Sequence, residues 1–365
     1  MPAATLSVRP FGVLPDGRAV DEYTLDNGRG LRLRAINYGG IVTAIECPDR
    51  DGRSANVVLG FDNLADYVER NPHFGTLVGR HANRVAGARF ALDGHEHRLA
   101  ANDGAHALHG GPGGFGRRWW SVRPVPATEV DGVAIDLQLT SEDGDQGYPG
   151  RLEVSVRYSL GPGGAWRVDY RAQCDRPTVV NLTQHSYFNL AGRGTALDHK
   201  LTLNASRFLQ TDAELIPTRV AEVAGTPFDF RTPRRIGERV RADDPRLRAA
   251  RGYDHCYLLD RPPQHAGLVH AARLADPSSG RVLDIDTTEP ALQLYSGNFL
   301  DGRLRGCRGE AYRQGDGVCL ETQHPPDAPN RADFPSTVLR PGQIFQSTTV
   351  HRFGVEASAL TTQET

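Results

Sequence analysis

Short runs of alternating or β-branched residues, each closed by a turn signal, follow one another along the whole chain. In residues 20–60 the run V-D-E-Y-T-L ends at Asp26-Asn27-Gly28, and the run I-V-T-A-I-E-C leads to Asp51-Gly52. Alternation over a few residues followed by such a turn is typical of antiparallel hairpins. The 40 glycines and 24 prolines are spread along the chain and not gathered in one tract. This distribution favours many short strands over long helices.

Only two stretches have helical character. Residues 61–71 carry apolar side chains at helical spacing, Leu64, Tyr67 and Val68, and residues 239–251 are weakly helical. No linker, low-complexity segment or convincing repeat divides the chain, although 365 residues would also be enough for two domains. We therefore expect an all-β fold in which residues 1–365 form a single domain. The architecture predicted is one large, mostly antiparallel β-sandwich (a supersandwich) with few short helices.

The net charge and the cysteines indicate which partners and which cellular compartment to expect. The net charge of -2 implies no field that would recruit nucleic acid or an anionic membrane. The five cysteines are odd in number, far apart and never arranged as C-x-x-C, which argues against a disulfide framework or a zinc knuckle. The N-terminus resembles no signal peptide, and no run of eighteen apolar residues occurs. We expect a soluble cytoplasmic protein.

Residues 178–190, T-V-V-N-L-T-Q-H-S-Y-F-N-L, alternate in an unusual way. With a period of two, one face is mostly apolar and suits a core. The other face offers amide, hydroxyl, imidazole and phenol groups with few formal charges, whereas a solvated face more often carries Lys, Glu, Arg or Asp. This pattern predicts the wall of a polar pocket, and the alternative is a core strand with a satisfied histidine. The polar face consists of Val179, Asn181, Thr183, His185, Tyr187 and Asn189.

Further polar groups stand at or near strand ends in contexts poor in other charges. Glu321 is the strongest candidate among them. It follows the apolar run Val318-Cys319-Leu320, so its carboxyl is expected to be partly desolvated. Desolvation raises a carboxyl pKa from about 4.3 toward neutrality. The alternative is a strand-end glutamate paired with an arginine. The other candidates are Asn83, Arg84, His109, His185, Asp254 and Gln293.

An imidazole with a pKa near 6.5 and a carboxyl with a raised pKa would form an acid-base pair at neutral pH. Other chemistries find less support. The G-x-G-x-x-G match at residues 111–116 is followed by R-R-W-W and not by a helix of a βαβ unit, so it predicts no dinucleotide site. His95 and His97 lack a third metal ligand at suitable spacing and fit a solvated hairpin. The residues therefore indicate acid-base chemistry on a neutral polar substrate, with no cofactor and no metal.

Seven motifs, in order along nearly the whole chain, resemble those of the aldose 1-epimerases, or galactose mutarotases. They are N-Y-G-G at 37–40, G-R-H-A-N-R at 79–84, L-H-G-G at 108–111, Q-H-S-Y-F-N-L at 184–190, Y-D-H at 253–255, L-Q-L-Y-S-G-N-F at 292–299 and L-E-T-Q-H-P-P-D-A-P-N at 320–330. His81 and Cys256 depart from the pattern at positions where other residues are common.

The resemblance implies a β-sandwich with an open carbohydrate cleft that interconverts the anomers of free hexoses such as galactose and glucose. By the same resemblance, Glu321 is the base that takes the anomeric hydroxyl proton, and His185 is the acid that protonates the ring oxygen. Tyr187 is expected beside the acid. The residues expected to hold sugar hydroxyls are Asn83, Arg84, His109, Asp254 and Gln293.

Two alternatives stay open at this point: a noncatalytic sugar-binding module and a hexose-6-phosphate 1-epimerase, both on the same scaffold. An optical-rotation assay tests the first alternative, because a noncatalytic module would bind sugar without changing the rate of mutarotation. A comparison of glucose with glucose 6-phosphate tests the second. The expected partner is a small monosaccharide, with no nucleic acid and no membrane, and the protein is expected to be a monomer or a homodimer. The preferred sugar depends on a few contacts worth roughly 1 to 3 kcal/mol each.

Overall fold

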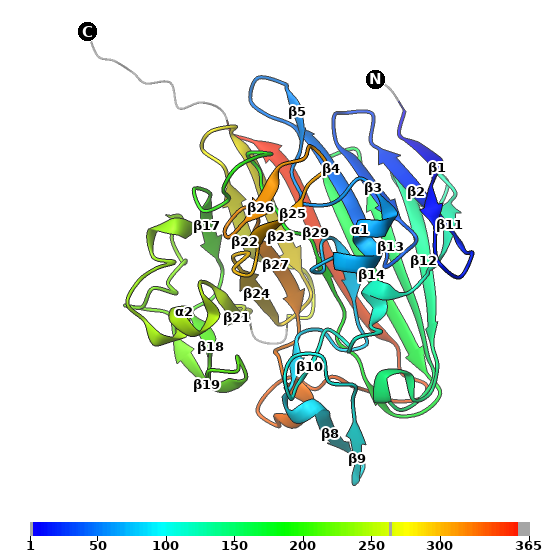
Figure 1. Cartoon of the computed structure of the whole chain (residues 1–365), viewed down its shortest axis with the longest axis vertical. Coiled ribbons are helices and arrows are strands. Elements are labelled where there is room, and N and C mark those ends of the chain that lie inside the picture. Colours follow the sequence, from blue (N-terminus) through cyan, green and yellow to red (C-terminus); the bar gives the residue numbers. More distant parts are fainter. Residues whose placement is uncertain (1–2, 263–264, 357–365) are drawn as a thin grey trace.

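A nine-stranded antiparallel sheet forms the base of the molecule. The computed structural model describes residues 3–262 and 265–356. Figure 1 shows this sheet behind the other elements, with the red strand β29 near its middle. In spatial order the strands are β11 (Ser121–Val125), β12 (Val133–Ser141), β13 (Leu152–Leu160), β14 (Ala165–Cys174), β29 (Phe345–Val355), β23 (Arg281–Thr287), β22 (Val269–Ala275), β17 (Lys200–Leu203) and β20 (Arg234–Arg235).

Two five-stranded sheets pack in front of this base. One of them lies over the β11–β14 half, where its blue strands cross the green ones in Figure 1. It contains β1 (Thr5–Val13), β2 (Ala19–Asp26), β3 (Arg32–Ile36), β4 (Val42–Pro48) and β5 (Ser54–Asn56). The other lies toward β22 and β17 and contains β19 (Pro217–Glu222), β18 (Arg207–Thr211), β21 (Asp254–Leu258), β24 (Ala291–Tyr295) and β27 (Cys319–Gln323).

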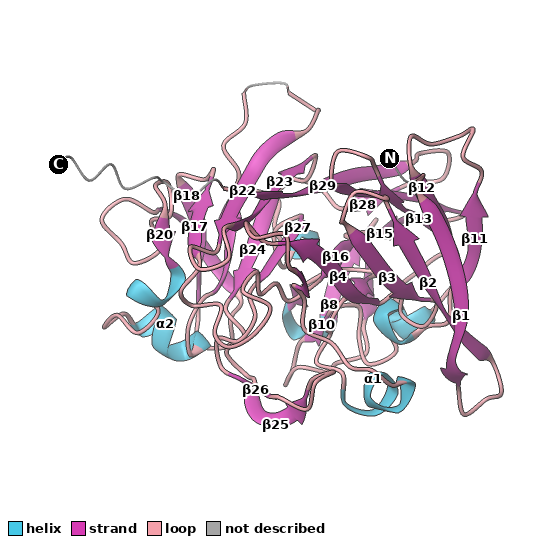
Figure 2. Ribbon diagram, turned by 90° about the horizontal axis from the view of Figure 1, so that it is seen from above, coloured by secondary structure: helices cyan, strands magenta, loops and turns pink. Residues whose placement is uncertain are grey.

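Short strand pairs, two α-helices and five three-residue 3-10 helices complete the described part of the chain. Figure 2 shows α1 and α2 at the periphery of the molecule. The α-helices are α1 (Leu64–Arg70) and α2 (Pro245–Ala250). The pairs are β6 (Thr76–Val78) with β16 (Thr183–His185), β7 (Arg84–Val85) with β10 (Ala107–Leu108), β8 (Arg89–Leu92) with β9 (His95–Arg98), β15 (Thr178–Val179) with β28 (Val338–Leu339), and β25 (Asp301–Arg305) with β26 (Ala311–Arg313).

The predicted all-β class, with antiparallel pairing and few short helices, is confirmed. Both α-helices lie inside the stretches with helical character. Asn63 caps α1 by accepting the Asp66 amide proton at 2.9 Å. Asp244 caps α2 in the same way with the Arg246 amide, at 2.9 Å. A short polar side chain before the first turn satisfies an amide that would otherwise lack a partner.

The main apolar core lies between the layers and draws on both front sheets. The strict alternation of β14 turns Trp166, Val168 and Tyr170 inward. The layers are also joined by a hydrogen bond, since the Tyr158 hydroxyl donates to the Gly40 carbonyl oxygen at 2.8 Å. His351 of β29 lies in this interior, with its ring stacked 4.5 Å from the Trp166 ring at 20°.

Residues 178–190 do not form the one continuous strand that their alternation suggests. Only β15 and β16 are regular strands there, and isolated bridges occur at Asn181 and Phe188. Both faces are buried, since several loops and sheets converge on this segment. The Asn181 amide, expected in the pocket wall, instead donates to the His324 carbonyl oxygen at 3.2 Å.

None of the helices in the described ranges is both long enough and apolar enough to span a lipid bilayer.

Candidate active site

The side chains of one face of β21, β24 and β27 form a buried polar wall. Register pairs Gln293 with Glu321 across β24 and β27, and pairs Asp254 with Tyr295 across β21 and β24. Residues paired in this way point to the same side of a sheet, as do residues two apart along a strand. Asp254, Gln293 and Glu321 therefore share one face, and each is at most 8% exposed.

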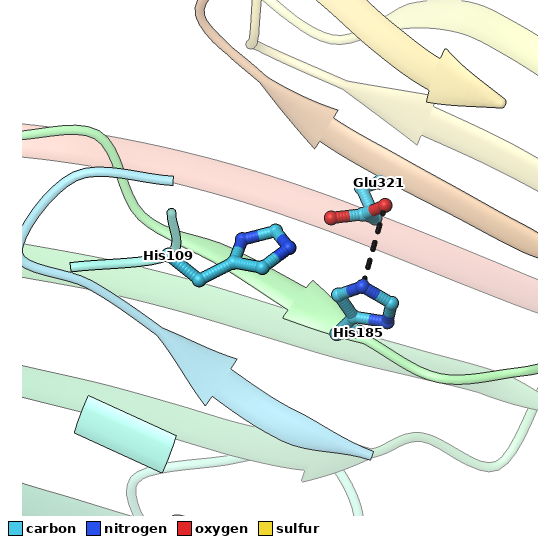
Figure 3. Close-up of side chains that lie close together, drawn as sticks. All are labelled: His109, His185 and Glu321. Carbon is cyan, nitrogen blue, oxygen red and sulfur yellow. Dashed lines mark ion pairs between the residues drawn. The ribbon is translucent and has the colours of Figure 1, made fainter. Parts of the chain in front are cut away.

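His185 reaches this wall from β16, which pairs with β6 so that His185 lies opposite Thr76. Its Nε2 lies 3.6 Å from Oε1 of Glu321. Figure 3 shows the two side chains facing each other, with His109 beside them. Neither Nδ1 of His185 nor Oε2 of Glu321 has a hydrogen-bond partner among the described residues. Buried polar atoms left in this state are available to a ligand.

The loop that carries Asn83 and the loop that carries His109 hold each other in place. The backbone N–H of Asn83 donates to Nδ1 of His109 at 3.2 Å, and the backbone N–H of His109 donates to the backbone carbonyl oxygen of Asn83 at 3.2 Å. Both residues have positive φ, 61° and 51°. Non-glycine residues in that region cost energy and cluster at functional sites. Gly110 is required here, because a Cβ would lie 2.0 Å from the Gly79 carbonyl oxygen.

Arg84, Asp254 and Gln293 form a connected charged group. Gln293 Nε2 donates to Oδ1 of Asp254 at 2.6 Å, and Arg84 Nη1 lies 3.7 Å from Oδ2 of Asp254. Arg84 also donates through Nε to Asp103 at 2.7 Å. The carbonyl oxygen of Gln293, Oε1, lacks a partner among the described residues. Such groups, held by one another and still open on one side, are suited to bind hydroxyl groups.

Aromatic rings enclose the centre of the site. The Tyr187 ring lies 5.1 Å from the His185 ring at 24°, and its hydroxyl donates to the Pro72 carbonyl oxygen at 2.9 Å. The Tyr295 ring lies 5.9 Å from the Tyr187 ring. With these rings in place, His185 is 4% exposed and Glu321 is 2% exposed. Both groups of the proposed acid-base pair are therefore largely removed from water.

Burial sets the protonation of the central pair. Desolvation raises the pKa of Glu321 well above its ordinary value, the charge of Asp254 adds to this, and the charge of Arg84 opposes it. Desolvation lowers the pKa of His185 to about 3, helped by the neighbouring His73. The carboxyl behaves as predicted, whereas the expectation of an imidazole pKa near 6.5 is wrong because the ring is removed from water.

The only group of potential metal ligands that meets in the described ranges is His109, His185 and Glu321, with ligand atoms within 4.8 Å of one another. The geometry of His109 fits a metal poorly. Its Nδ1 accepts a hydrogen bond from the backbone N–H of Asn83, so the neutral ring carries its own proton on Nε2. A metal would need that nitrogen unprotonated. The arrangement fits a hydrogen-bond donor to a hydroxyl group better. His95 and His97 lie in the β8–β9 hairpin, outside this group.

The structure brings all the predicted site residues into one region and adds others. His73 and Asp103 are neighbours that sequence reasoning missed. His73 follows a proline in a loop, and Asp103 lies in a polar turn, so neither had an alternation pattern to mark it. The positive φ of His73, 73°, is a backbone signal that only coordinates show.

The fold is an antiparallel β-sandwich, and its site brings a carboxyl and an imidazole together in a buried polar centre, an arrangement suited to acid-base chemistry. The family model for aldose 1-epimerase matches residues 21–352. Galactose mutarotase from Homo sapiens is 42% identical over 356 residues, covering 96% of this chain and 99% of the relative. Aldose 1-epimerase from Escherichia coli (strain K12) is 36% identical over 347 residues, covering 94% and 97%.

Solved structures agree with these relatives. The crystal structure of galactose 1-epimerase from Lactobacillus acidophilus NCFM superimposes with a TM-score of 0.86 at 30% identity, covering 97% of this chain and all, 100%, of that one. The chain belongs to the aldose 1-epimerase family. It is accordingly an isomerase with mutarotase function.

Proposed function

We propose that the protein interconverts the α and β anomers of free aldohexoses such as galactose and glucose, with Glu321 as base and His185 as acid. The observation that carries this proposal is the 3.6 Å separation of Nε2 of His185 from Oε1 of Glu321. The name galactose mutarotase, borne by relatives 42% to 44% identical to this chain, supports the choice of hexose.

The proposed reaction moves two protons and needs no net change in the enzyme. Glu321 takes the proton from O1 while His185 delivers one to O5, so the C1–O5 bond breaks and an aldehyde forms. Rotation about C1–C2 turns the other face of the carbonyl toward the ring-closing hydroxyl. The roles then reverse: Glu321 returns a proton to O1, and His185 removes the proton from the attacking hydroxyl. The ring closes as the other anomer.

Before the sugar binds, one proton can lie on either Glu321 or His185. A neutral carboxyl with a neutral imidazole has the same net charge as a carboxylate with an imidazolium. The raised pKa of Glu321 and the lowered pKa of His185 favour the neutral arrangement without sugar. In our proposal, a bound sugar favours the charged arrangement, because O1–H donates to the carboxylate and O5 accepts from the imidazolium. Arg84 assists, since its charge opposes the rise in the Glu321 pKa.

The remaining site residues are proposed to hold the sugar. His109, fixed by Asn83, would donate from Nε2 to a hydroxyl, and Gln293 offers an unpartnered carbonyl oxygen. Arg84 and Asp254 supply a donor and an acceptor side by side. Tyr187 would present its ring beside the acid. No step assigned to these residues requires a metal or an organic cofactor.

Polarimetry tests the proposal. The rotation of freshly dissolved α-D-galactose or α-D-glucose should reach equilibrium faster with the protein present. Glu321→Gln keeps the shape of the side chain and removes the base, so it should reduce kcat by about 10²- to 10⁴-fold. Equal rates for wild type and Glu321→Gln would remove Glu321 from the mechanism. Glucose 6-phosphate as a better substrate than glucose would favour the phosphate-specific alternative.

Compartment, domain organisation and assembly are also proposals. We infer a cytoplasmic location from the five cysteines, all of which are free. We infer that the chain acts as one domain because one apolar cluster includes residues from β2, β14 and β24. That it is a monomer or a homodimer stays a prediction. The near-neutral net charge of -2 supports the absence of nucleic-acid and membrane partners.

A further inference from the structure

The His185 ring lacks the hydrogen bond that usually orients an acid-base histidine. In such residues one ring nitrogen does the chemistry, and a hydrogen bond at the other fixes the tautomer and the ring orientation. Here Nε2 faces Glu321, and Nδ1 is buried without a partner among the described residues. Something else must therefore hold the ring at the angle that points Nε2 toward the carboxyl.

Two nearly parallel rings flank His185. The Tyr187 ring lies at 5.1 Å and 24°, and the His73 ring lies at 5.6 Å and 26°. The His73 ring also lies 4.7 Å from the His109 ring, so it touches both histidines of the site. Stacked rings of this kind contribute roughly 0.5 to 1.5 kcal/mol each beyond the apolar area they bury. A stack of this size favours one rotamer of His185 by about 2- to 13-fold.

The backbone around His73 is tied to the strand that carries His185. The Gly75 amide donates to the His185 carbonyl oxygen at 3.0 Å, and the Thr76 amide donates to the His73 carbonyl oxygen at 3.2 Å. Pro72 accepts the Tyr187 hydroxyl proton at 2.9 Å. One short segment therefore positions both rings that flank His185.

His73 occupies a backbone conformation that glycine would adopt without cost. Its φ is 73°, in the left-handed region, where a non-glycine residue is strained and persists mainly at functional sites. Its imidazole makes no hydrogen bond to any residue in the described ranges, so hydrogen bonding within the protein does not account for the side chain. The ring contacts of this side chain are with His185 and His109.

We infer that His73 is a positioning residue that orients the His185 ring by stacking, in place of a hydrogen bond to Nδ1. This inference rests on the proposed role of His185 and adds a residue that the sequence motifs did not mark. His109 is held independently by its two hydrogen bonds with Asn83. Loss of the His73 ring should therefore disturb mainly the orientation of the His185 ring, lowering kcat and leaving KM nearly unchanged. Small displacements of a catalytic group can cost about 10²-fold in rate.

Three substitutions distinguish the effect of the His73 ring from the effects of its nitrogens and of the strained backbone. His73→Gly removes the ring and suits the left-handed φ, and His73→Asn also tolerates this φ but has no ring. His73→Phe keeps a stacking ring and lacks the nitrogens. We expect kcat to fall by about 10- to 100-fold in His73→Gly and His73→Asn, with KM within about 3-fold of wild type. His73→Phe should keep kcat within about 3-fold.

A matched control is Asp93→Gly, which relieves another positive φ, 51°, in the exposed turn between β8 and β9. Its kcat should equal that of wild type. Wild-type kcat in either His73→Gly or His73→Asn would overturn the inference. Equal losses in all three variants would assign the effect to the ring nitrogens and also overturn it, as would a rise in KM at constant kcat. Absence of catalysis by wild type would instead reject the proposed function.

Discussion

His185 in the polar site and His351 in the sandwich interior have almost the same local description. They are 4% and 3% exposed, desolvation lowers the pKa of each to about 3, and each ring stacks on an aromatic neighbour. Each also has an Nδ1 without a hydrogen-bond partner among the described residues. Burial, a shifted pKa and an unpartnered nitrogen therefore do not by themselves identify a site.

The difference lies in what faces the ring. The His185 ring has a carboxyl at 3.6 Å, and that carboxyl itself retains an unpartnered oxygen. The His351 ring lies between Trp166 and Phe188, with centroids at 4.5 Å and 5.8 Å. One histidine faces a neighbour whose pKa is shifted in the opposite direction, whereas the ring contacts of the other are with aromatic side chains. We infer that function in this fold depends on pairing two groups whose pKa values are shifted in opposite directions.

Replacing each histidine by glutamine should give the largest contrast. His185→Gln removes the proposed acid and should lower kcat by about 10²- to 10⁴-fold. His351→Gln removes a core ring and should lower the free energy of unfolding by about 1 to 3 kcal/mol, with kcat per folded molecule unchanged. Polarimetry and urea unfolding at pH 7 measure the two effects. A His351→Gln enzyme with the same loss of kcat would break the comparison.

The pH dependence of stability should respond in opposite directions to His351 in the interior and to Glu321 in the site. His351 has a folded pKa of about 3, so between that value and about 6.5 the unfolded chain binds the extra proton, and stability falls as pH decreases. Glu321 has a raised folded pKa, so above about 4.5 the folded state keeps a proton that the unfolded chain loses, and stability falls as pH increases.

Removing each group should therefore change the slope of unfolding free energy against pH by up to about 1.4 kcal/mol per pH unit. Between pH 5 and 6, the free energy of unfolding should rise less with pH in His351→Gln than in wild type, and should rise more with pH in Glu321→Gln. Glu321→Gln should also be more stable than wild type at pH 7. Urea unfolding at intervals of half a pH unit measures the slopes. Parallel changes in both variants would contradict the assigned pKa directions.

A matched pair of tyrosines gives the smallest expected effect. Tyr158 donates to Gly40 O at 2.8 Å in the interior, and Tyr187 donates to Pro72 O at 2.9 Å beside His185. Phenylalanine at either position should cost about 0.5 to 1.5 kcal/mol of stability, the usual worth of one hydrogen bond. Only Tyr187→Phe should also lower kcat, by a few-fold, because Pro72 adjoins His73. Equal kcat values in both variants would show that this bond does not support the site.

Much of the fold was predictable because its determinants are local. Asp26-Asn27-Gly28 specifies a turn within three residues, and the alternation of residues 165–174 specifies β14 within ten. The prediction for residues 178–190 was only partly right for a physical reason. Alternation reports which side chains differ in polarity, and it does not report whether a neighbouring strand will pair along the whole length.

The sequence by itself determined the β-sandwich class, the family and the chemical types present in the site, since turn chemistry, alternation and motif order are written in neighbouring residues. Only the tertiary structure decided that His185 and Glu321 lie 3.6 Å apart. It also decided that their pKa values move in opposite directions and that His73 stacks against the pair. Proximity and desolvation arise from groups far apart along the chain, and no local pattern encodes them.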